Sequence, residues 1–368
     1  MKNTFGTNLG ITLFGESHGE VIGAVLDGIP GGIDVDMEYI RKKMMMRKST
    51  QPWSTERKES DEVRIVTGVF EGKTTGAPIT FLLENTDVRS EDYIRYKDCP
   101  RPGHSDYTSY VKYHGANDYR GGGHSSGRLT APLVAAASLV QYILEKKGIL
   151  IGTHIVACGP LAESTFSTRE EELREELKKV NQDVFPVLDE ELRRLMIEYV
   201  CSVKAEKDSA GGVLETAVSG LEAGVGEPWF DNLESILAHG IFSIPGVKGV
   251  SFGRGFAFSS MLGSEANDSF YVEDGTIRTK TNNNGGINGG ISNGMPIIIN
   301  TAIKPTASIG QVQASIDLRT DEEVFLEGRG RHDPAIFARA RAVVDSMVAF
   351  CVADMLCSRY GTEWLYEE

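Results

Sequence analysis

The sequence predicts a mixed α+β fold in which antiparallel sheets pack against buried helices. Short apolar runs typical of strands alternate irregularly with helical patterns, and no strand–helix–strand unit repeats along the chain. One helical segment, residues 129–147, is apolar on most of its faces, as expected of a helix inside a core. Glycine is abundant, at 41 residues, but its clusters show no period, which argues against a solenoid. We therefore expect a single domain spanning 1–368, without an internal linker.

The N-terminal part of the chain is expected to form one sheet and one helix. Residues 9–14 and 21–26 read as strands on either side of a GESHG loop. Asp36 can cap a helix that runs through MEYIRKKMMMRK. Residues 63–70 and 77–84 are rich in β-forming side chains and are expected to pair through the GKTTG turn.

The C-terminal part is expected to add a second set of strands and a long final helix. Residues 168–207 carry two charged helices, and the charged region of about 163–209 reads as an insertion rather than a second domain. Asp333 and Pro334 have the pattern of an N-cap followed by proline at the first helical position, opening a helix through Ser358. The strand candidates of this part are 149–159, 211–221, 247–256 and 296–303.

Composition limits the classes of function. The net charge of −14 argues against a nucleic-acid or membrane-surface partner, because both need a positive face. No apolar run reaches the roughly 18 residues that span a bilayer, and the N-terminus lacks the pattern of a secretory signal. Five cysteines without a CxxC pair predict reduced structural thiols and no metal site. We expect a cytoplasmic protein.

The segment from Arg101 to Pro132 inverts the charge of the chain. It holds three of the seven histidines and a glycine-rich turn, and we expect it to form a long ligand-binding loop. A cationic island with titratable groups suits a small, multiply anionic ligand better than a polymer. Its cations are Arg101, Lys112, Arg120 and Arg128, against the acidic residues Asp106 and Asp118.

Several motifs are open to more than one interpretation. GESHG matches the G-x-S-x-G nucleophile elbow, which would make Ser17 the nucleophile of a serine hydrolase, but an elbow needs a helix after it. The His104–Asp106 pair of GHSD could bind a metal, yet no further ligand spacing accompanies it. GGGHSSGR, with Arg128, leads into the apolar helix and is either an anion cradle or a capped turn. NGGISNG and KPTAS, with Lys304, are weaker signals of the same kind, and Asp333 of GRHDP is an N-cap or a base.

Taken in order, these segments resemble the chorismate synthase family. The matching motifs span residues 6–350, apart from 163–209, and eight of them in the correct order are far more specific than any one alone. They are GESHG, the E-x-D-E-V block with GVFEGKTTGAPI, ENTDVRSEDY, RPGHSDYT, GGGHSSGR, GGISNG, KPTAS and GRHDP.

The resemblance implies an activity, a fold and an assembly. The family is a carbon–oxygen lyase that eliminates phosphate from 5-enolpyruvylshikimate 3-phosphate to give chorismate, a step of the shikimate pathway toward the aromatic amino acids. It needs reduced FMN, although the net reaction is redox-neutral. The implied fold is a β-α-β sandwich with helices between antiparallel sheets, and the implied assembly is a homotetramer. A catalytically silent flavin-binding protein remains a further alternative.

The resemblance also implies roles for individual residues. His18 would protonate the departing phosphate, His104 would lie near the reduced flavin, and Asp333 would govern a flavin proton. Ser17 and Ser126 would relay or order these protons. Arg128, with Arg47, would hold phosphate oxygens of the substrate or of NADPH. The implied flavin contacts are His124, Ser125, Ser126, Gly246, Gly289, Lys304, Pro305, Thr306, Ala307, Ser308 and Arg331.

This chain departs from the family pattern in three places. MMMRKS stands where the family has an arginine-rich RRRPG stretch, which leaves Arg47 as the candidate there. HSSGRLT replaces RSSARET, placing His124 and Leu129 in the cradle, and Pro245–Gly246 stands where Asn-Ala is usual. These changes affect the contacts expected for NADPH, so we consider flavin reduction by a separate reductase as well as by NADPH.

Overall fold

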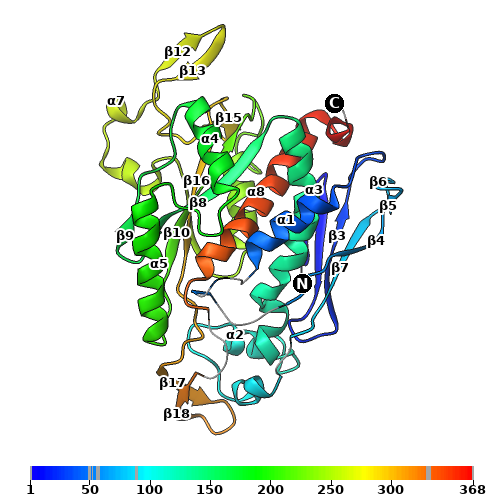
Figure 1. Ribbon diagram of the computed structural model, residues 1–368, viewed down its shortest axis with the longest axis vertical. Coiled ribbons are helices and arrows are strands. Elements are labelled where there is room, and N and C mark those ends of the chain that lie inside the picture. Colours follow the sequence, from blue (N-terminus) through cyan, green and yellow to red (C-terminus); the bar gives the residue numbers. More distant parts are fainter. Residues whose placement is uncertain are drawn as a thin grey trace.

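Two antiparallel sheets with helices packed between them make up the fold (Figure 1). The computed structural model describes residues 2–48, 51, 53–54, 59–87, 90–328 and 333–366. Within these residues the first sheet has the strand order β1-β2-β3-β7-β4 and the second has β11-β16-β10-β8-β9. The first sheet contains β1 (Thr4–Phe5), β2 (Gly10–Gly15), β3 (Val21–Asp27), β4 (Arg64–Thr67) and β7 (Ile79–Glu84). The second contains β8 (Leu150–Cys158), β9 (Leu161–Ala162), β10 (Gly212–Ser219), β11 (Val247–Phe252) and β16 (Ile297–Ile303).

Three helices lie between the sheets, α1 (Met37–Arg47), α3 (Thr130–Lys146) and α8 (Ile336–Tyr360). Helix α3 packs against α1, α8 and the first sheet, whereas α8 packs against β8 and β10 of the second. The run Ala135–Ala137 on α3 is completely buried, as are Ala349 and Ala353 on α8. Such small side chains allow helix backbones to approach closely. The predicted α+β class, with buried helices between antiparallel sheets, is confirmed.

Helix α3 is both long and apolar. Together with the turn before it, Gly127–Lys146 is long and apolar enough to span a bilayer by length and composition, and 83% of its most apolar window is buried within the fold. Its N-terminal end lies beside Arg47 and its C-terminal end is followed by Gly148, whose φ is +83°. A buried core helix passes the same composition test as a membrane span.

The charged region forms a layer on the outer face of the second sheet. Helix α4 (Glu170–Val180) packs on β8 and β10, and α5 (Glu190–Ala205) packs on β9. Along β10, Ala217 contacts the α4 cluster while Val218 faces the central core, as the alternation of a strand requires. The two predicted helices are therefore confirmed.

The predicted element boundaries were wrong in three places, one of them the strand expected over 247–256, which ends at Phe252 before a 3-10 helix that begins at Gly255. The segment 101–132, expected to be a long loop, contains α2 (Asp106–Lys112) and three-residue-per-turn helices. Helix α8 begins at Ile336 rather than at Pro334, because Ala335 is extended (φ −152°, ψ 71°). Asp333 therefore accepts from the Ala335 amide at 3.1 Å in a local turn rather than capping the helix directly. All five cysteines are free thiols, as expected.

Smaller elements complete the described chain. One further helix, α6 (Leu233–Phe242), packs on α8 and β11, and α7 (Gly263–Ala266) is a single turn. The short strands are β5 (Val69–Phe70), β6 (Lys73–Thr74), β12 (Phe270–Glu273), β13 (Thr276–Thr279), β14 (Ile287–Asn288), β15 (Ile291–Ser292), β17 (Val312–Asp317) and β18 (Glu322–Glu327). The 3-10 helices are η1 (Ser90–Lys97), η2 (Arg120–Ser125), η3 (Gly127–Leu129), η4 (Gly255–Ser260) and η5 (Thr362–Leu365).

Candidate active site

A run of three glycines in η2 lies between the two histidines that the motifs singled out. Gly121, Gly122 and Gly123 all have positive φ, a conformation that side chains other than glycine rarely adopt. A Cβ on Gly121 would lie 2.4 Å from Cε1 of His18, and a Cβ on Gly122 would lie 3.2 Å from Cε1 of His104. The structure therefore brings both imidazoles to one loop.

The GESHG loop connects β2 to β3 and is fixed against the same glycines. The Ser17 amide donates to the Gly123 carbonyl at 3.1 Å, and Ser17 is completely buried. Because the segment after the loop is strand β3 rather than a helix, the loop lacks the geometry of a nucleophile elbow. This absence of a following helix removes the structural basis for a serine hydrolase.

An aromatic pair in η1 connects His18 to the RPGH segment. The ring of Tyr93 meets the His18 ring edge to face, with 5.0 Å between centroids. The Arg101 guanidinium lies over Tyr93 at 5.7 Å and over Tyr96 at 4.7 Å. The sequence analysis did not single out these tyrosines, although Tyr93 lies in the ENTDVRSEDY motif.

His104 is paired with a buried carboxylate. Its Nδ1 lies 2.7 Å from Oδ1 of Asp106, and Arg101 donates to both carboxylate oxygens from Nε and Nη2 at 2.7 and 2.8 Å. Burial disfavours the charged form of Asp106, but the hydrogen bonds from Arg101 and His104 outweigh burial and hold the pKa of this carboxyl well below its ordinary value. The GHSD pair is therefore part of a contact network with Arg101.

The KPTAS loop lies against the same segment. Lys304 follows β16 and forms no ion pair with a carboxylate among the described residues. Its Nζ donates to the Gly103 carbonyl at 2.5 Å. Ser308 Oγ accepts from Arg101 Nη1 at 3.0 Å, and the Lys304 amide donates to the Gly246 carbonyl at 2.9 Å. The cluster thus contains the loop that carries Pro305, Thr306 and Ala307.

Asp333 is connected with the KPTAS loop by contacts of the residues next to it, Pro334 with Ala210 and Gly211 with Pro305. Its carboxylate accepts from Arg339 as well as from the Ala335 amide. The next residue, Pro334, accepts at its carbonyl from the Ala210 amide at 2.7 Å. The Cβ of a residue at Gly211 would then lie 3.1 Å from Pro305. Arg331, a predicted flavin contact, lies outside the described residues.

His124, Ser125 and Ser126 occupy different positions along the glycine turn. His124 Nδ1 lies 2.8 Å from the Gly15 carbonyl and its Nε2 lies 3.2 Å from Oδ1 of Asn3, so both nitrogens contact protein oxygens. Ser125 is exposed, whereas Ser126 accepts from the Arg128 amide at 3.3 Å. Ser126 is near His104, because its Cβ would be 3.8 Å from a Cβ on Gly122.

Gly289 is not brought to this cluster. It is exposed in the hairpin between β14 and β15, where the neighbouring Gly290 carbonyl accepts from Leu233 at the start of α6. The hairpin precedes β16 and Lys304 follows it, so the two lie at opposite ends of that strand. Figure 1 shows β15 at one end of the molecule and α2 near the other.

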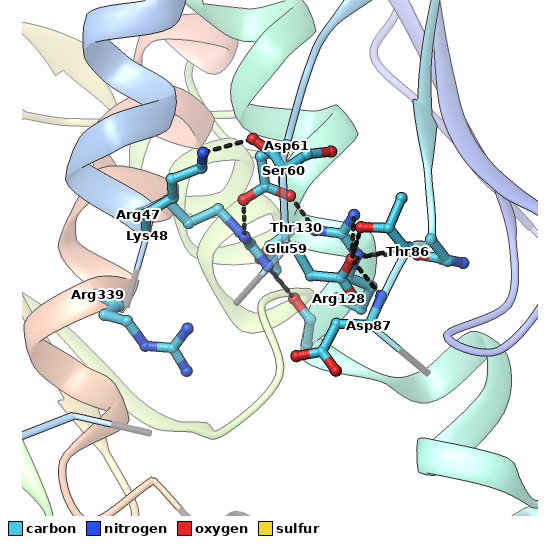
Figure 2. A network of polar contacts seen from close by, with 12 residues as sticks. Arg47, Lys48, Glu59, Ser60, Asp61, Thr86, Asp87, Arg128, Thr130 and Arg339 are labelled. Atoms are coloured by element: carbon cyan, nitrogen blue, oxygen red, sulfur yellow. Dashed lines mark hydrogen bonds and ion pairs between the residues drawn. The ribbon is translucent and has the colours of Figure 1, made fainter. Parts of the chain in front are cut away.

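Arg47 and Arg128 meet at Asp61, as Figure 2 shows. All three side chains are more than nine-tenths buried. Burial disfavours ionised Asp61, but the charges of Arg47 and Arg128 outweigh it and lower the pKa of this carboxyl. Both guanidiniums are also hydrogen-bonded elsewhere, to Thr130, Gly127, Asn85 and Glu84.

Comparison with known proteins gives a consistent result over the whole chain. A family model described as chorismate synthase matches residues 9–357. A chorismate synthase of Pyrococcus abyssi is 46% identical over 354 residues, covering 96% of this chain and 97% of the relative. One of Thermococcus gammatolerans is 44% identical over 358 residues, covering 97% and 98%. A solved structure titled "Crystal Structure of Chorismate Synthase" has a TM-score of 0.77 at 24% identity, covers 98% of this chain and 97% of that chain, and shows a similar fold.

Proposed function

The chain belongs to the chorismate synthase family, and from that premise we propose that it eliminates phosphate from 5-enolpyruvylshikimate 3-phosphate to give chorismate. The observation that carries the proposal is the meeting of His18 and His104 at one glycine loop. The reaction removes a phosphate group and a proton from the substrate, so it needs groups that exchange protons at short range. Two imidazoles beside a glycine turn and a cationic loop supply that chemistry.

The proton-handling residues are assigned by their positions around the glycines. His18 would donate to the departing phosphate, with Ser17 beside it against Gly121. His104 and Ser126 lie beside Gly122 and would transfer or order the proton of the reduced flavin. Asp333, which is paired with Arg339, would accept a proton from the flavin region.

We propose that reduced FMN binds along the KPTAS loop. The Thr306 Oγ1 is buried and has no hydrogen-bond partner among the described residues, which fits a contact with a ligand. Lys304 would neutralise an anionic group of the cofactor, and Gly246 and Ala307 would allow close approach of its ring. When bound, reduced FMN lends electron density to the substrate and recovers it after phosphate leaves.

Arg47 and Arg128, whose guanidiniums both contact Asp61, are proposed to bind oxyanions of the substrate or of NADPH. Both guanidiniums lie against Asp61, and Arg128 also lies 3.9 Å from the buried Glu59, so an entering oxyanion would share the guanidiniums with these two carboxylates. NADPH and a separate flavin reductase remain the two proposed sources of electrons. Anaerobic mixing with NADPH and oxidised FMN, followed by flavin absorbance, separates them, because bleaching without an added reductase requires the protein itself.

The proposed assembly is a homotetramer of single-domain chains, with residues 163–209 as a peripheral insertion. One continuous core cluster that includes residues of both sheets and of the helices between them supports the single domain. Large aromatic side chains that are at least two-thirds exposed support further association, namely Phe70, Trp229, Phe230, Phe256, Phe270 and Phe325. Free thiols at every cysteine support a reducing compartment such as the cytoplasm. Light scattering would give the protomer number.

The test of the function is an anaerobic assay with reduced FMN and 5-enolpyruvylshikimate 3-phosphate, followed by chorismate absorbance. We expect product only when reduced flavin is present. A folded protein that forms no chorismate under these conditions would falsify the proposal. A fluorophosphonate should leave Ser17 unlabelled, whereas covalent labelling at Ser17 would favour the hydrolase.

A further inference from the structure

One nitrogen of His104 is held by a side chain two residues further along the chain. Its Nδ1 lies 2.7 Å from Oδ1 of Asp106, and the carboxylate is 6% exposed. The pair stands at the start of α2, where the His104 amide donates to the Arg101 carbonyl at 3.2 Å. The local turn therefore sets the distance between the imidazole and the carboxylate.

Asp106 is itself fixed by Arg101. The Arg101 backbone amide and Nε both donate to Oδ2, at 3.0 and 2.7 Å, and Nη2 donates to Oδ1 at 2.8 Å. Arg101 is in turn held over Tyr96 and bonded to Ser308. A carboxylate in such a fork stays ionised and can only accept hydrogen bonds.

The chemistry of the partner determines the tautomer of His104. Because ionised Asp106 accepts, Nδ1 must carry the hydrogen of this contact. Arg101 Nη2, which carries two hydrogens, donates to Asp106 Oδ1 at 2.8 Å and lies 3.2 Å from the same Nδ1, but an Nδ1 without hydrogen would set its lone pair against the carboxylate oxygen only 2.7 Å away. Nε2 is then the nitrogen whose protonation changes. That edge of the ring faces Gly122, since a Cβ there would lie 3.5 Å from Nε2.

We propose that Asp106 is a positioning residue that acts through His104, fixing Nε2 as the nitrogen that exchanges a proton in the site. When Nε2–H gives up its proton, Nδ1–H remains on Asp106 and the ring becomes neutral, so one proton moves and no other bond changes. The other charged groups around this ring are Arg101, Lys304 at the Gly103 carbonyl, and His18 across the glycine turn. The inference rests on the proposed function for its effect on catalysis, but not for its effect on the tautomer.

The direct test is Asp106→Asn, which keeps the shape of the side chain and removes its charge. With imidazole ¹⁵N shifts as the readout, we expect His104 to be protonated at Nδ1 in the wild type, and to lose that preference in Asp106→Asn. We expect kcat to fall by about a hundredfold, with KM for the phosphorylated substrate changed by less than about threefold. Asp106→Glu should recover part of kcat, because it restores the charge.

The matched control is Asp317→Asn. Asp317 accepts from the amide, Nε and Nη2 of Arg319, two residues away, in a similar arrangement on the β17–β18 hairpin. It should leave kcat and the His104 spectrum unchanged. The double variant Asp106→Asn with His104→Ala should be no slower than His104→Ala alone. Asp106 acts through the His104 imidazole, so its substitution has no further effect once that ring is gone.

The outcomes separate this inference from the proposed function. An unchanged His104 tautomer in Asp106→Asn overturns the inference, as does a double variant whose loss equals the product of the single losses. If Asp106→Asn does not fold, the wild-type spectrum decides, and hydrogen on Nε2 alone contradicts the inference. A wild type that makes no chorismate rejects the function, while the tautomer measurement still tests the contact.

Discussion

Single residues in the site depend on the absence of side chains at Gly121 and Gly122. A methyl group on Gly121 would overlap the His18 imidazole, and one on Gly122 would lie only 3.2 Å from the His104 ring. Each glycine also has a positive φ, at 59° and 87°, so a substitution there is strained twice, by the backbone and by the contact. The turn therefore fixes the position of both histidines.

Replacing either histidine should separate binding from catalysis. His18→Ala and His104→Ala should each keep flavin binding and lose about a hundredfold or more in turnover, because each removes one proton-transfer group. Flavin titration and the anaerobic chorismate assay on the same preparation give both quantities. Loss of folding in either variant would instead indicate that the histidine is a core residue.

Gly121→Ala should reduce turnover strongly while leaving the distant core intact. Its methyl group would lie 2.4 Å from His18 Cε1 and 2.8 Å from Ser17 Oγ, so His18 must move. The matched control is Gly127→Ala in the next turn, where an added Cβ meets nothing within 4 Å. Turnover of the two variants is compared at equal thermal stability. Equal activity in both would contradict the role of the turn.

Asp61→Asn should destabilise the protein by about 3 kcal/mol, because it removes the carboxylate that the buried guanidiniums of Arg47 and Arg128 share. Asp34→Asn is the control, since it breaks an exposed pair with Lys73 and should cost far less than Asp61→Asn. Chemical denaturation measures both. A similar small change in the two variants would show that Asp61 is not an essential partner of Arg47 and Arg128.

At the scale of elements, the outer layer is joined to the second sheet by a buried ion cluster. His154 on β8 contacts Glu163 through Nδ1 at 2.5 Å and Glu215 on β10 through Nε2 at 3.0 Å. Glu163 also accepts from the amides of Leu188 and Asp189 just before α5. Burial alone would lower the pKa of His154, but the two carboxylates outweigh it and raise the pKa above its ordinary value.

This pKa direction gives a signed prediction for stability against pH. A raised pKa in the folded state stabilises the protein fully below the ordinary histidine value of about 6.5, and that contribution is lost as pH rises through the folded value. The advantage of the wild type over His154→Gln in thermal unfolding should therefore shrink from pH 6 toward alkaline pH. A difference that is constant with pH would contradict the charged cluster.

Elements with a strong local pattern were predictable, and others were not. Residues 9–14 and 21–26 are short apolar runs on either side of a glycine-containing loop, and the segment 129–147 is long and apolar on most faces, so the sequence identifies all three. Helix α2 was missed because DYTSYVK has no apolar period, and Ser105 makes no side-chain cap. The start of α8 was placed too early because the Asp333–Pro334 pattern is the same for an N-cap and for a local turn.

The site was predictable as a set of motifs but not as a set of contacts. His18, His104 and Lys304 could be named from their motifs and the family resemblance. Their meeting depends on pairing between segments far apart in the chain, which local patterns do not encode. For the same reason Tyr93 and Asp61 were not singled out, although both lie in quoted motifs. The family resemblance also included Gly289, but the hairpin that carries Gly289 precedes β16, whereas Lys304 follows that strand.

On the scale of the whole molecule, the two sheets and the helices between them hold separate loops at one place. The GESHG loop comes from the first sheet, the KPTAS loop from the second, and the glycine turn leads into α3 between them. No single layer contains the site. Its geometry therefore depends on the packing of the complete sandwich, which is why we expect flavin binding and global folding to be lost together on denaturation.

The most direct measurement is a crystal structure of the protein with FMN and 5-enolpyruvylshikimate 3-phosphate. The account predicts the flavin ring against the KPTAS loop, with the substrate between it and His18, and ligand atoms within about 3 Å of both imidazoles. Ligand density elsewhere on the chain, with His18 and His104 touching neither molecule, would contradict it.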